Sequence, residues 1–196
     1  LIAALRSLDA PAPDALARRL LQNEGSAEDV GLSPFVMAAL QVSFACRAAR
    51  IDPADVPYAE PATICPVCAS APVASVLRIG GQVAGHRYLH CGTCATEWHM
   101  VRVKCSHCES TQGVRYQGIE GGQDVVTAET CEACGTYRKL VNQEKDPLAE
   151  PLADDLASLT LDLLMSETPF SRANPNPLLF VAVAEEAPAT GGAPAP

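Results

Sequence analysis

The sequence lacks any apolar run of about 18 residues, which is the length that a helix needs to cross a membrane. It also lacks an export signal, because the apolar stretch at residues 1–8 is short and is interrupted by Arg6. Arg18 and Arg19 resemble part of a twin-arginine signal, but the segment that follows them is too polar. The sequence therefore predicts neither a membrane span nor export. Because the chain starts at Leu1, in the middle of an apolar-periodic segment, we expect an N-terminal part to be missing.

Basic residues are few, and no set of catalytic residues is apparent. The chain has 14 Lys and Arg residues against 23 Asp and Glu residues, so its net charge is −9. Proteins that bind the phosphate backbone of nucleic acids normally carry a basic surface, so this charge argues against such a role. The sequence shows no Ser–His–Asp set, no phosphate-binding glycine loop followed by Lys, and no suggestive carboxylate pair. We therefore predict that the protein is not an enzyme.

Cysteine, in contrast, is abundant, with nine residues in the chain. Eight of them form four Cys-x-x-Cys pairs, and adding 40 to each number of the first two pairs gives the last two. A glycine turn at Gly80-Gly81 recurs almost in register at Gly121-Gly122, which indicates an internal duplication. The paired cysteines are Cys65, Cys68, Cys91 and Cys94 in the first unit, and Cys105, Cys108, Cys131 and Cys134 in the second.

The spacing of these cysteines predicts two tetrathiolate metal sites. Two thiolates separated by two residues can bind one metal from a tight turn, and a hairpin that returns a second such turn completes a tetrahedron. Disulfides are the weaker alternative, because nine is an odd number and no export signal is present. A redox dithiol is weaker still, because four regular pairs exceed what one exchange reaction uses. A site with four sulfurs has no open coordination position, so we do not expect hydrolytic catalysis.

Two features of the sites stay open at this point. The duplication favours sites made of consecutive pairs, with interleaved pairs as the minor alternative. Four thiolates suit either zinc or a rubredoxin-like iron, and the sequence does not separate the two metals.

The pattern of predicted elements indicates an α+β fold with four parts. A helical segment spans residues 1–59, and two tandem ribbons of short strands span 60–102 and 103–145. A C-terminal acidic helix followed by an irregular tail spans 146–196. Strands are expected in six segments rich in β-branched and aromatic residues, which are VASVLRI, HRYLH, TEWHMVRV, GVRYQGI, DVVTAET and TYRKLVN.

Both helical segments carry apolar patterns that predict buried faces. Ser33 is the expected N-cap of a helix with Pro34 in its first turn. Apolar residues cover so much of this helix that we expect it to be well buried, with Cys46 as a small core residue. The residues concerned are Phe35, Val36, Ala39, Leu40 and Val42 in this helix, and Leu156, Leu159, Leu163 and Leu164 form the expected stripe of the C-terminal helix.

Several polar and aromatic residues are candidates for contact with a partner protein. Trp98 is the only tryptophan, and we weigh packing between the two ribbons against a partner surface that includes His99 and Arg102. Strand alternation would place Trp98 and Arg102 on one face and His99 on the other. The acidic residues Glu150, Asp154, Asp155 and Asp162 are expected on a solvated helix face, with a basic partner as the alternative. His86 is expected to be exposed, and His90 and His107 are expected near the sites but not as ligands.

The order of these motifs resembles the formate dehydrogenase accessory protein family of the FdhE type. The resemblance runs over about residues 33 to 182, and it includes the linking strand and the acidic helix as well as the cysteines. It is carried by ICPVC, ASVLRIGG, RYLHC, TEWHMVRVKCSHC, AETCEACGTYRKL and QEKDPLAEPLADDLASLTLDLL.

The resemblance implies a cytoplasmic accessory factor, without enzymatic activity, that acts on the catalytic subunit of respiratory formate dehydrogenase before export. It also implies rubredoxin-like iron, with zinc as the alternative, bound by all eight paired cysteines. Family members often have glycine after the first knuckle, where this chain has Ala69, which we expect to be tolerated if its φ is negative. The family's N-terminal helical region is longer than residues 1–59. The rival hypotheses are a rubredoxin-like electron carrier and, more weakly, a zinc-ribbon module that binds nucleic acid.

Overall fold

The computed structural model describes residues 11–22, 24–58, 60–79 and 85–179 of the chain. Two helices, α2 (Pro11–Leu21) and α3 (Ser33–Ala48), come first and are joined by the short 3-10 helix η1 (Ala27–Asp29). A second 3-10 helix, η2 (Pro53–Asp55), leads towards the sheet. In the described residues, no helix is both long and apolar enough to span a bilayer.

All six predicted strands are present, and they form one mixed sheet in the order β3-β2-β1-β6-β5-β4, with the short strand β7 beside β6. Their bounds are Pro72–Leu77 for β1, Arg87–Cys91 for β2, Glu97–His99 for β3, Val114–Gln117 for β4, Val126–Cys131 for β5, Thr136–Asn142 for β6 and Ser171–Arg172 for β7.

The two ribbons repeat along the sheet in the same direction. In both, the order of strands across the sheet is third, second, first, so β1 of the first ribbon lies next to β6 of the second. These two strands pair in parallel, with Ser75 opposite Leu140, whereas the strands within each ribbon are antiparallel. Every residue of β1 is buried, which fits its place in the middle of the sheet.

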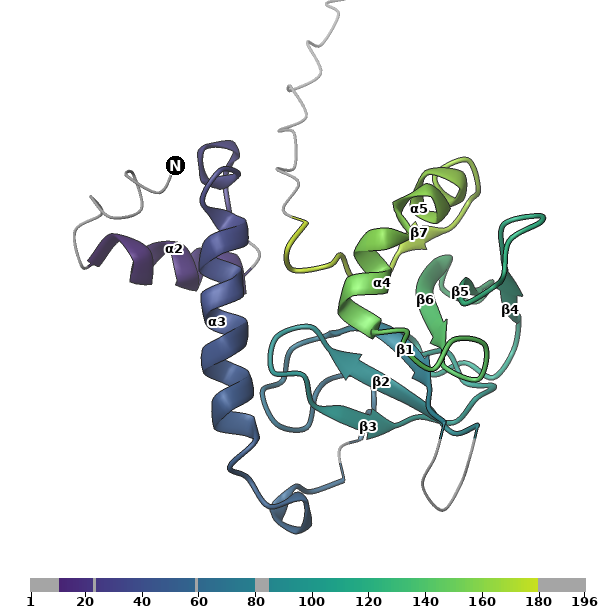
Figure 1. The fold of residues 1–196 in the computed structure, drawn as a ribbon, viewed down its shortest axis with the longest axis horizontal. Helices are drawn as coiled ribbons and strands as arrows, with labels where there is room; N and C mark the ends of the chain where they lie inside the picture. The colour runs from purple at the N-terminus through teal and green to yellow at the C-terminus, as the bar shows by residue number, and fades with distance from the viewer. Residues whose placement is uncertain (1–10, 23, 59, 80–84, 180–196) are drawn as a thin grey trace, which may run out of the picture.

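The helices lie on two sides of this sheet (Figure 1). Helices α2 and α3 stand together beside the first ribbon, and α4 (Pro151–Ala157) packs over β1 and β6. Helix α5 (Leu159–Met165) follows and packs near β5. Four buried residues, Leu16, Leu20, Val36 and Met37, hold α2 against α3.

The prediction of a well-buried helix at residues 33–48 is wrong. Of the residues in α3, only Ser33, Val36 and Met37 are buried, and Val42 is 66% exposed and Phe35 44% exposed. The described residues that pack on α3 are α2 and Leu178 near its start and the first ribbon near Phe44 towards its end, which leaves much of its surface exposed. Cys46 is accordingly exposed and is not a core residue.

The predicted N-cap of α3 is also wrong. Ser33 is the first residue of α3 and not its N-cap, and its hydroxyl donates to the carbonyl oxygen of Asp29 at 2.6 Å. In the C-terminal segment, Glu150 caps α4 by accepting a hydrogen bond from the Ala153 amide at 2.7 Å. Asp154 lies in the first turn of this helix.

The C-terminal segment forms two short helices where one was predicted. Ser158 separates α4 from α5 with φ −105° and ψ 33°, so the phase of the apolar pattern changes there. Three leucines of the predicted stripe, Leu159, Leu163 and Leu164, are exposed, and Leu156 is half-buried. Leu161 and Met165 are buried in their place. These two residues pack against Ala128 and Tyr137 of the sheet.

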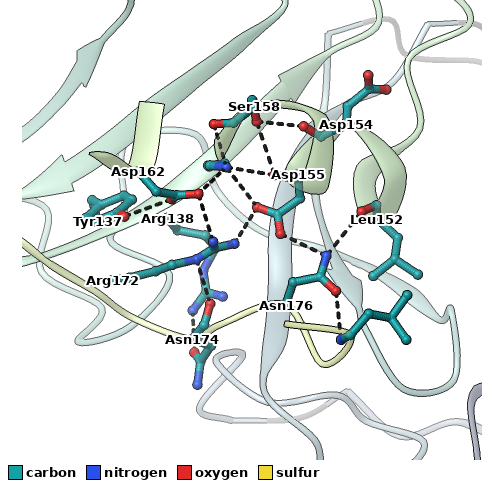
Figure 2. A network of polar contacts seen from close by, with 12 residues as sticks. Tyr137, Arg138, Leu152, Asp154, Asp155, Ser158, Asp162, Arg172, Asn174 and Asn176 are labelled. Atoms are coloured by element: carbon teal, nitrogen blue, oxygen red, sulfur yellow. Dashed lines mark hydrogen bonds and ion pairs between the residues drawn. The ribbon is translucent and has the colours of Figure 1, made fainter. Parts of the chain in front are cut away.

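A buried polar network fixes this segment to β6 (Figure 2). Lys139 is fully buried, and its Nζ lies 2.6 Å from Asp162 Oδ2 and donates to the carbonyl oxygens of Asp155 at 2.8 Å and Ser158 at 3.0 Å. Arg172 pairs with both Asp155 and Asp162, the latter at 3.2 Å. A cation at the last carbonyls of α4 is favourable, because those groups have no partner within the helix.

The acidic face predicted for the C-terminal helix is therefore partly internal. Asp155 is 0% exposed, and its Oδ2 accepts a hydrogen bond from Asn176 Nδ2 at 2.9 Å. Asp162 accepts a hydrogen bond from the Tyr137 hydroxyl at 2.8 Å. Burial, together with this carboxylate, raises the pKa of Tyr137. Because its side chain is enclosed, Asp155 is excluded as a partner-contacting residue, which corrects the prediction.

We predict that Asp155→Ala lowers the free energy of unfolding by about 3–5 kcal/mol, because it leaves the Lys139 and Arg172 cations buried without a full set of partners. Urea unfolding of the metal-loaded chain measures the loss. Glu167→Gln, at an exposed acidic residue beyond α5, is the matched control and should change stability by no more than about 0.5 kcal/mol. Equal effects of the two substitutions would contradict a stabilising role for the network.

Candidate metal centres

The first group of four sulfurs gathers where the 65–68 turn meets the end of β2. Sγ of Cys65 lies 3.5 Å from Sγ of Cys94, and Sγ of Cys68 lies 3.5 Å from Sγ of Cys91. All four Sγ atoms lie within 4.8 Å of one another. A tetrahedral metal with bonds of about 2.3 Å places its sulfurs about 3.8 Å apart, so the group has the size of a metal cage.

The second group repeats this arrangement at the end of β5. Sγ of Cys105 lies 3.8 Å from Sγ of Cys134, and Sγ of Cys108 lies 3.8 Å from Sγ of Cys131. These four Sγ atoms also lie within 4.8 Å of one another. The structure thus brings together consecutive pairs, as the duplication predicts, and not interleaved ones.

The duplication extends to the backbone of the knuckles. The amide of Cys65 donates to the carbonyl of Ser70 at 2.9 Å, and the amide of Cys105 donates to that of Ser110 at 2.8 Å. Beyond each cage, a threonine hydroxyl lies 3.1 Å from a cysteine sulfur, with Thr96 beside Cys94 and Thr136 beside Cys134. Sequence reasoning missed the two threonines, although the shift of 40 residues relates them as it relates the cysteines.

The residue after each knuckle takes a left-handed conformation. Ala69, Ala95, Glu109 and Gly135 have φ values of 60°, 58°, 62° and 68°. The condition under which Ala69 was expected to be tolerated, a negative φ, is therefore not met. Such a conformation costs a residue with a side chain roughly 1–2 kcal/mol, so the closed cage must hold three of these four positions against local preference.

The sulfurs of each group influence one another's protonation. In the first group, the Cys65 thiol hydrogen-bonds to Cys68 and lowers the pKa of Cys68 to about 6, while the neighbouring sulfurs raise the pKa of Cys91. In the second group, burial raises the pKa of Cys105 to about 12. Burial acts in the same sense on Cys134, but hydrogen bonds from Thr136 and from the neighbouring sulfurs together outweigh it and lower its pKa to about 7. Metal binding therefore has to release protons, and it weakens as the pH falls.

The two cages differ in their surroundings. Cys65, Cys91 and Cys94 are buried, and Phe44, Ala48, Val67 and Trp98 pack against them. In the second cage Cys105 and Cys131 are buried, but Cys108 is exposed and Cys134 is half-buried.

The histidines near the cages lie close to them without joining them. His90 is buried, and its Nδ1 lies 2.9 Å from Glu97 Oε1, which also pairs with Arg78. His107 is exposed, and its backbone amide donates to Cys105 Sγ at 3.4 Å. His86 is half-buried, which corrects the expectation of an exposed residue, and its ring lies 5.2 Å from that of His99.

Trp98 is half-buried and packs in a place that the sequence did not indicate. Its indole nitrogen donates to the carbonyl of Ala62 at 2.8 Å, and its ring contacts Leu89 and Met100 as well as the first cage. It therefore packs within the first ribbon and not between the two ribbons. His99 and Arg102 are exposed, and β3 ends at His99, so strand alternation does not extend to Arg102.

Three FdhE models match the chain in succession. The FdhE N-terminal model matches residues 1–60, the central-domain model matches 64–102, and the C-terminal-domain model matches 103–179. The chain belongs to the FdhE family. One cage lies in the region that matches the FdhE central domain, and the other lies in the region that matches the FdhE C-terminal domain. The match to the C-terminal domain starts at residue 103, where the second ribbon begins.

Known FdhE proteins resemble the chain over most of its length. It is 47% identical over 168 residues to the protein FdhE homolog of Cronobacter sakazakii, which covers 85% of the chain and 54% of the relative. It is 46% identical over 166 residues to protein FdhE of Salmonella arizonae, which covers 84% and 53%. The chain thus spans about half the length of these curated relatives.

A solved FdhE structure shares the fold. The crystal structure of the FdhE protein from Pseudomonas aeruginosa matches with a TM-score of 0.81 and 39% identity, over 91% of this chain and 63% of that chain. The α/β arrangement with two tetracysteine groups is therefore an FdhE fold.

We predict that Cys91→Ser reduces the metal content from about two ions per chain to about one and unfolds the first ribbon. The expected size of the effect follows from structural zinc, which can contribute roughly 10–16 kcal/mol to folding. Inductively coupled plasma mass spectrometry and the β signal in circular dichroism measure the two effects. Cys46→Ser, at the exposed cysteine outside both groups, should keep both metals. Two metals and a full β signal in Cys91→Ser would show that the cage is misassigned.

We predict that Gly135→Ala destabilises the metal-loaded chain by about 1 kcal/mol, because an added Cβ disfavours the left-handed conformation. The added atom would meet no other heavy atom within 4 Å, so the effect is one of backbone conformation alone. At the equivalent position of the first ribbon, Ala95→Gly relieves the same strain. The glycine of this variant has more backbone freedom in the unfolded chain, which offsets most of the gain in folding free energy. Urea unfolding of the two variants should therefore give shifts of opposite sign, and equal shifts would contradict the assigned conformations.

Proposed function

We propose that this chain is part of an accessory factor that binds the catalytic subunit of respiratory formate dehydrogenase and supports its assembly or activation. In this proposal it acts in the cytoplasm, before the subunit is exported, and it carries out no catalysis itself. The observation that carries the proposal is the succession of three FdhE matches over residues 1–179, together with two assembled tetracysteine groups.

The composition of the cages supports a role in binding rather than catalysis. Each cage offers four thiolate sulfurs to one metal ion, so a bound metal has no free position for a water or a substrate. We propose iron as the metal at both sites, with zinc as the alternative, and the eight paired cysteines as the ligands. Iron held by four thiolates can change its oxidation state by one electron, whereas zinc would only stabilise the fold.

The partner surface is proposed at the exposed end of the first ribbon. His99 and Arg102 are exposed in the segment that follows Trp98. Trp98 and His99 line a groove of about 370 Å³ between the end of α3 and β3. Exposed Tyr58 and Ile51 line the same groove. Asp154 is a weaker candidate, because its carboxylate accepts a hydrogen bond from the Glu150 amide.

The charge and the site chemistry do not favour the rival functions. A net charge of −9, to which two tetrathiolate cages holding divalent ions would add about −2 each, opposes binding to nucleic acid. A free electron carrier would need no complex with the enzyme subunit, so a binding experiment separates it from the proposal.

We predict that the tagged chain, expressed anaerobically with a formate dehydrogenase catalytic subunit, retains that subunit on purification. Arg102→Glu should reduce retention at least about tenfold if this exposed cation lies in the interface, because loss of an interfacial charge can cost about 2 kcal/mol or more. Lys145→Glu is the matched control, because Lys145 is an exposed cation whose one ion pair among the described residues is with Asp124 at 3.5 Å. Two metals per chain with no retained subunit would contradict the accessory function and favour an electron carrier.

A further inference from the structure

The first cage is enclosed on the side that faces α3. Phe44 and Ala48 of that helix, Val67 of the knuckle and Trp98 of β3 pack against its cysteines. The hydrogen bond from the Trp98 indole to the Ala62 carbonyl, at 2.8 Å, fixes the ring in this position. On that side, an incoming ligand would have to displace these side chains before it could reach the sulfurs. Cys65, Cys91 and Cys94 are buried, and Cys68 is half-buried.

The second cage has no comparable cover among the residues that the structure describes. Cys108 is exposed, and the residues on either side of it are His107, which is exposed, and Glu109, which pairs with Lys104 at 2.8 Å. The sulfur of Cys108 is therefore the metal ligand that an external molecule reaches first.

The opposite half of the second cage is held firmly. Ser106, inside the knuckle, accepts a hydrogen bond from Arg138 Nε at 2.8 Å. The same buried guanidinium donates to Asn174 Oδ1 at 3.0 Å and to the carbonyl of Pro72 in the first ribbon. Arg138 thereby links Cys105 and its knuckle to the neighbouring ribbon and to the segment fixed by the network of Figure 2.

A second buried arginine holds the chain that leads into this knuckle. Arg87 of β2 donates to the carbonyls of Arg102 at 3.2 Å and Lys104 at 2.9 Å, and it pairs with Glu129 of β5 at 2.5 Å. The residue before Cys105 and the strand that ends at Cys131 are thus both anchored to the first ribbon. Cys108, at the outer side of the cage, is instead exposed.

We propose that the second cage is a site of metal exchange, at which an external thiolate replaces Cys108, while the first cage retains its metal. The incoming sulfur forms a bond to the metal, the bond from the metal to Cys108 Sγ breaks, and Cys108 leaves as a thiolate. The proton given up by the incoming thiol goes to the released thiolate or to water, and the oxidation state of the metal does not change. This inference does not depend on the identity of the partner enzyme.

The test uses the full chain, in the Cys46→Ser background, loaded with two zinc ions and mixed with an excess of the chelator 4-(2-pyridylazo)resorcinol. We expect release in two phases of about one ion each, and the fast phase should exceed the slow one at least about tenfold in rate. The rate of the fast phase should rise with the concentration of added glutathione. A single phase for both ions, or a fast phase that neither glutathione nor a Cys-x-x-Cys peptide accelerates, would overturn the proposal.

Alkylation of the chain with iodoacetamide after the fast phase identifies the cage that has lost its metal. This experiment needs no substitution of a cysteine ligand. Mass spectrometry should find label on the cysteines of the second cage, with Cys108 first, and label on Cys65 or Cys94 instead would overturn the proposal. Phe44→Ala, which opens the cover of the first cage, should accelerate only the slow phase. Val42→Ala, on the exposed face of the same helix, is its matched control and should change neither phase.

The source of the thiolate is tested by a second pair of additions. A peptide that carries Cys-x-x-Cys is compared with glutathione at the same thiol concentration. Acceleration by both supports attack by any accessible thiolate, and acceleration by the peptide alone supports exchange with a protein dithiol. If neither additive accelerates the release, thiolate attack at Cys108 is rejected.

Discussion

The structure depends on the close grouping of four cysteine sulfurs, whose mutual repulsion as thiolates a bound metal would relieve. Each group places four cysteines within 4.8 Å, which is a costly arrangement for thiolates unless a cation lies between them. The roughly 10–16 kcal/mol that a structural zinc can contribute is at least as large as the whole stability of a typical domain, about 5–15 kcal/mol. We propose that bound metals hold the knuckles, which place alanine and glutamate in left-handed conformations, while backbone pairing joins the short strands between them.

The sheet joins two such units, and the apolar clusters that pack on it are small in the part of the chain that the structure describes. The central strand pair, β1 and β6, connects ribbons that repeat in the same direction, and buried cations connect them further. Arg87 pairs with Glu129 and donates to carbonyls of the segment that joins the two ribbons. Arg138 donates to Ser106 in the Cys105–Cys108 turn, and Lys139 pairs with Asp162 of α5. Burial raises the pKa of Glu129. Burial also lowers the pKa of Arg138 to about 10, although the neighbouring carboxylate and thiolate oppose this shift. These contacts therefore secure the arrangement of the ribbons at an electrostatic cost.

The cysteine spacing predicted the cages because a Cys-x-x-Cys turn and a hairpin leave little geometric choice. The strands were also predictable, since each lies in a short segment that holds β-branched or aromatic residues. The burial of individual side chains was not predictable, because it depends on which other elements pack against each helix or strand. The apolar pattern of α3 overstated its burial, and Asp155 gave no sign in the sequence that Lys139 and Arg172 would enclose it. The break at Ser158 separates two short helices and changes which residues of the second helix face the sheet. The regular spacing of the leucines gave no indication of this break.

The central claim is that the eight cysteines form two separate tetrathiolate metal centres. X-ray absorption spectroscopy of the anaerobically purified chain, combined with metal analysis, tests it most directly. The account predicts about two metal ions per chain, each surrounded by four sulfurs at about 2.3 Å and by no nitrogen or oxygen ligand. One ion per chain, or a first shell that mixes sulfur with nitrogen or oxygen, would contradict it.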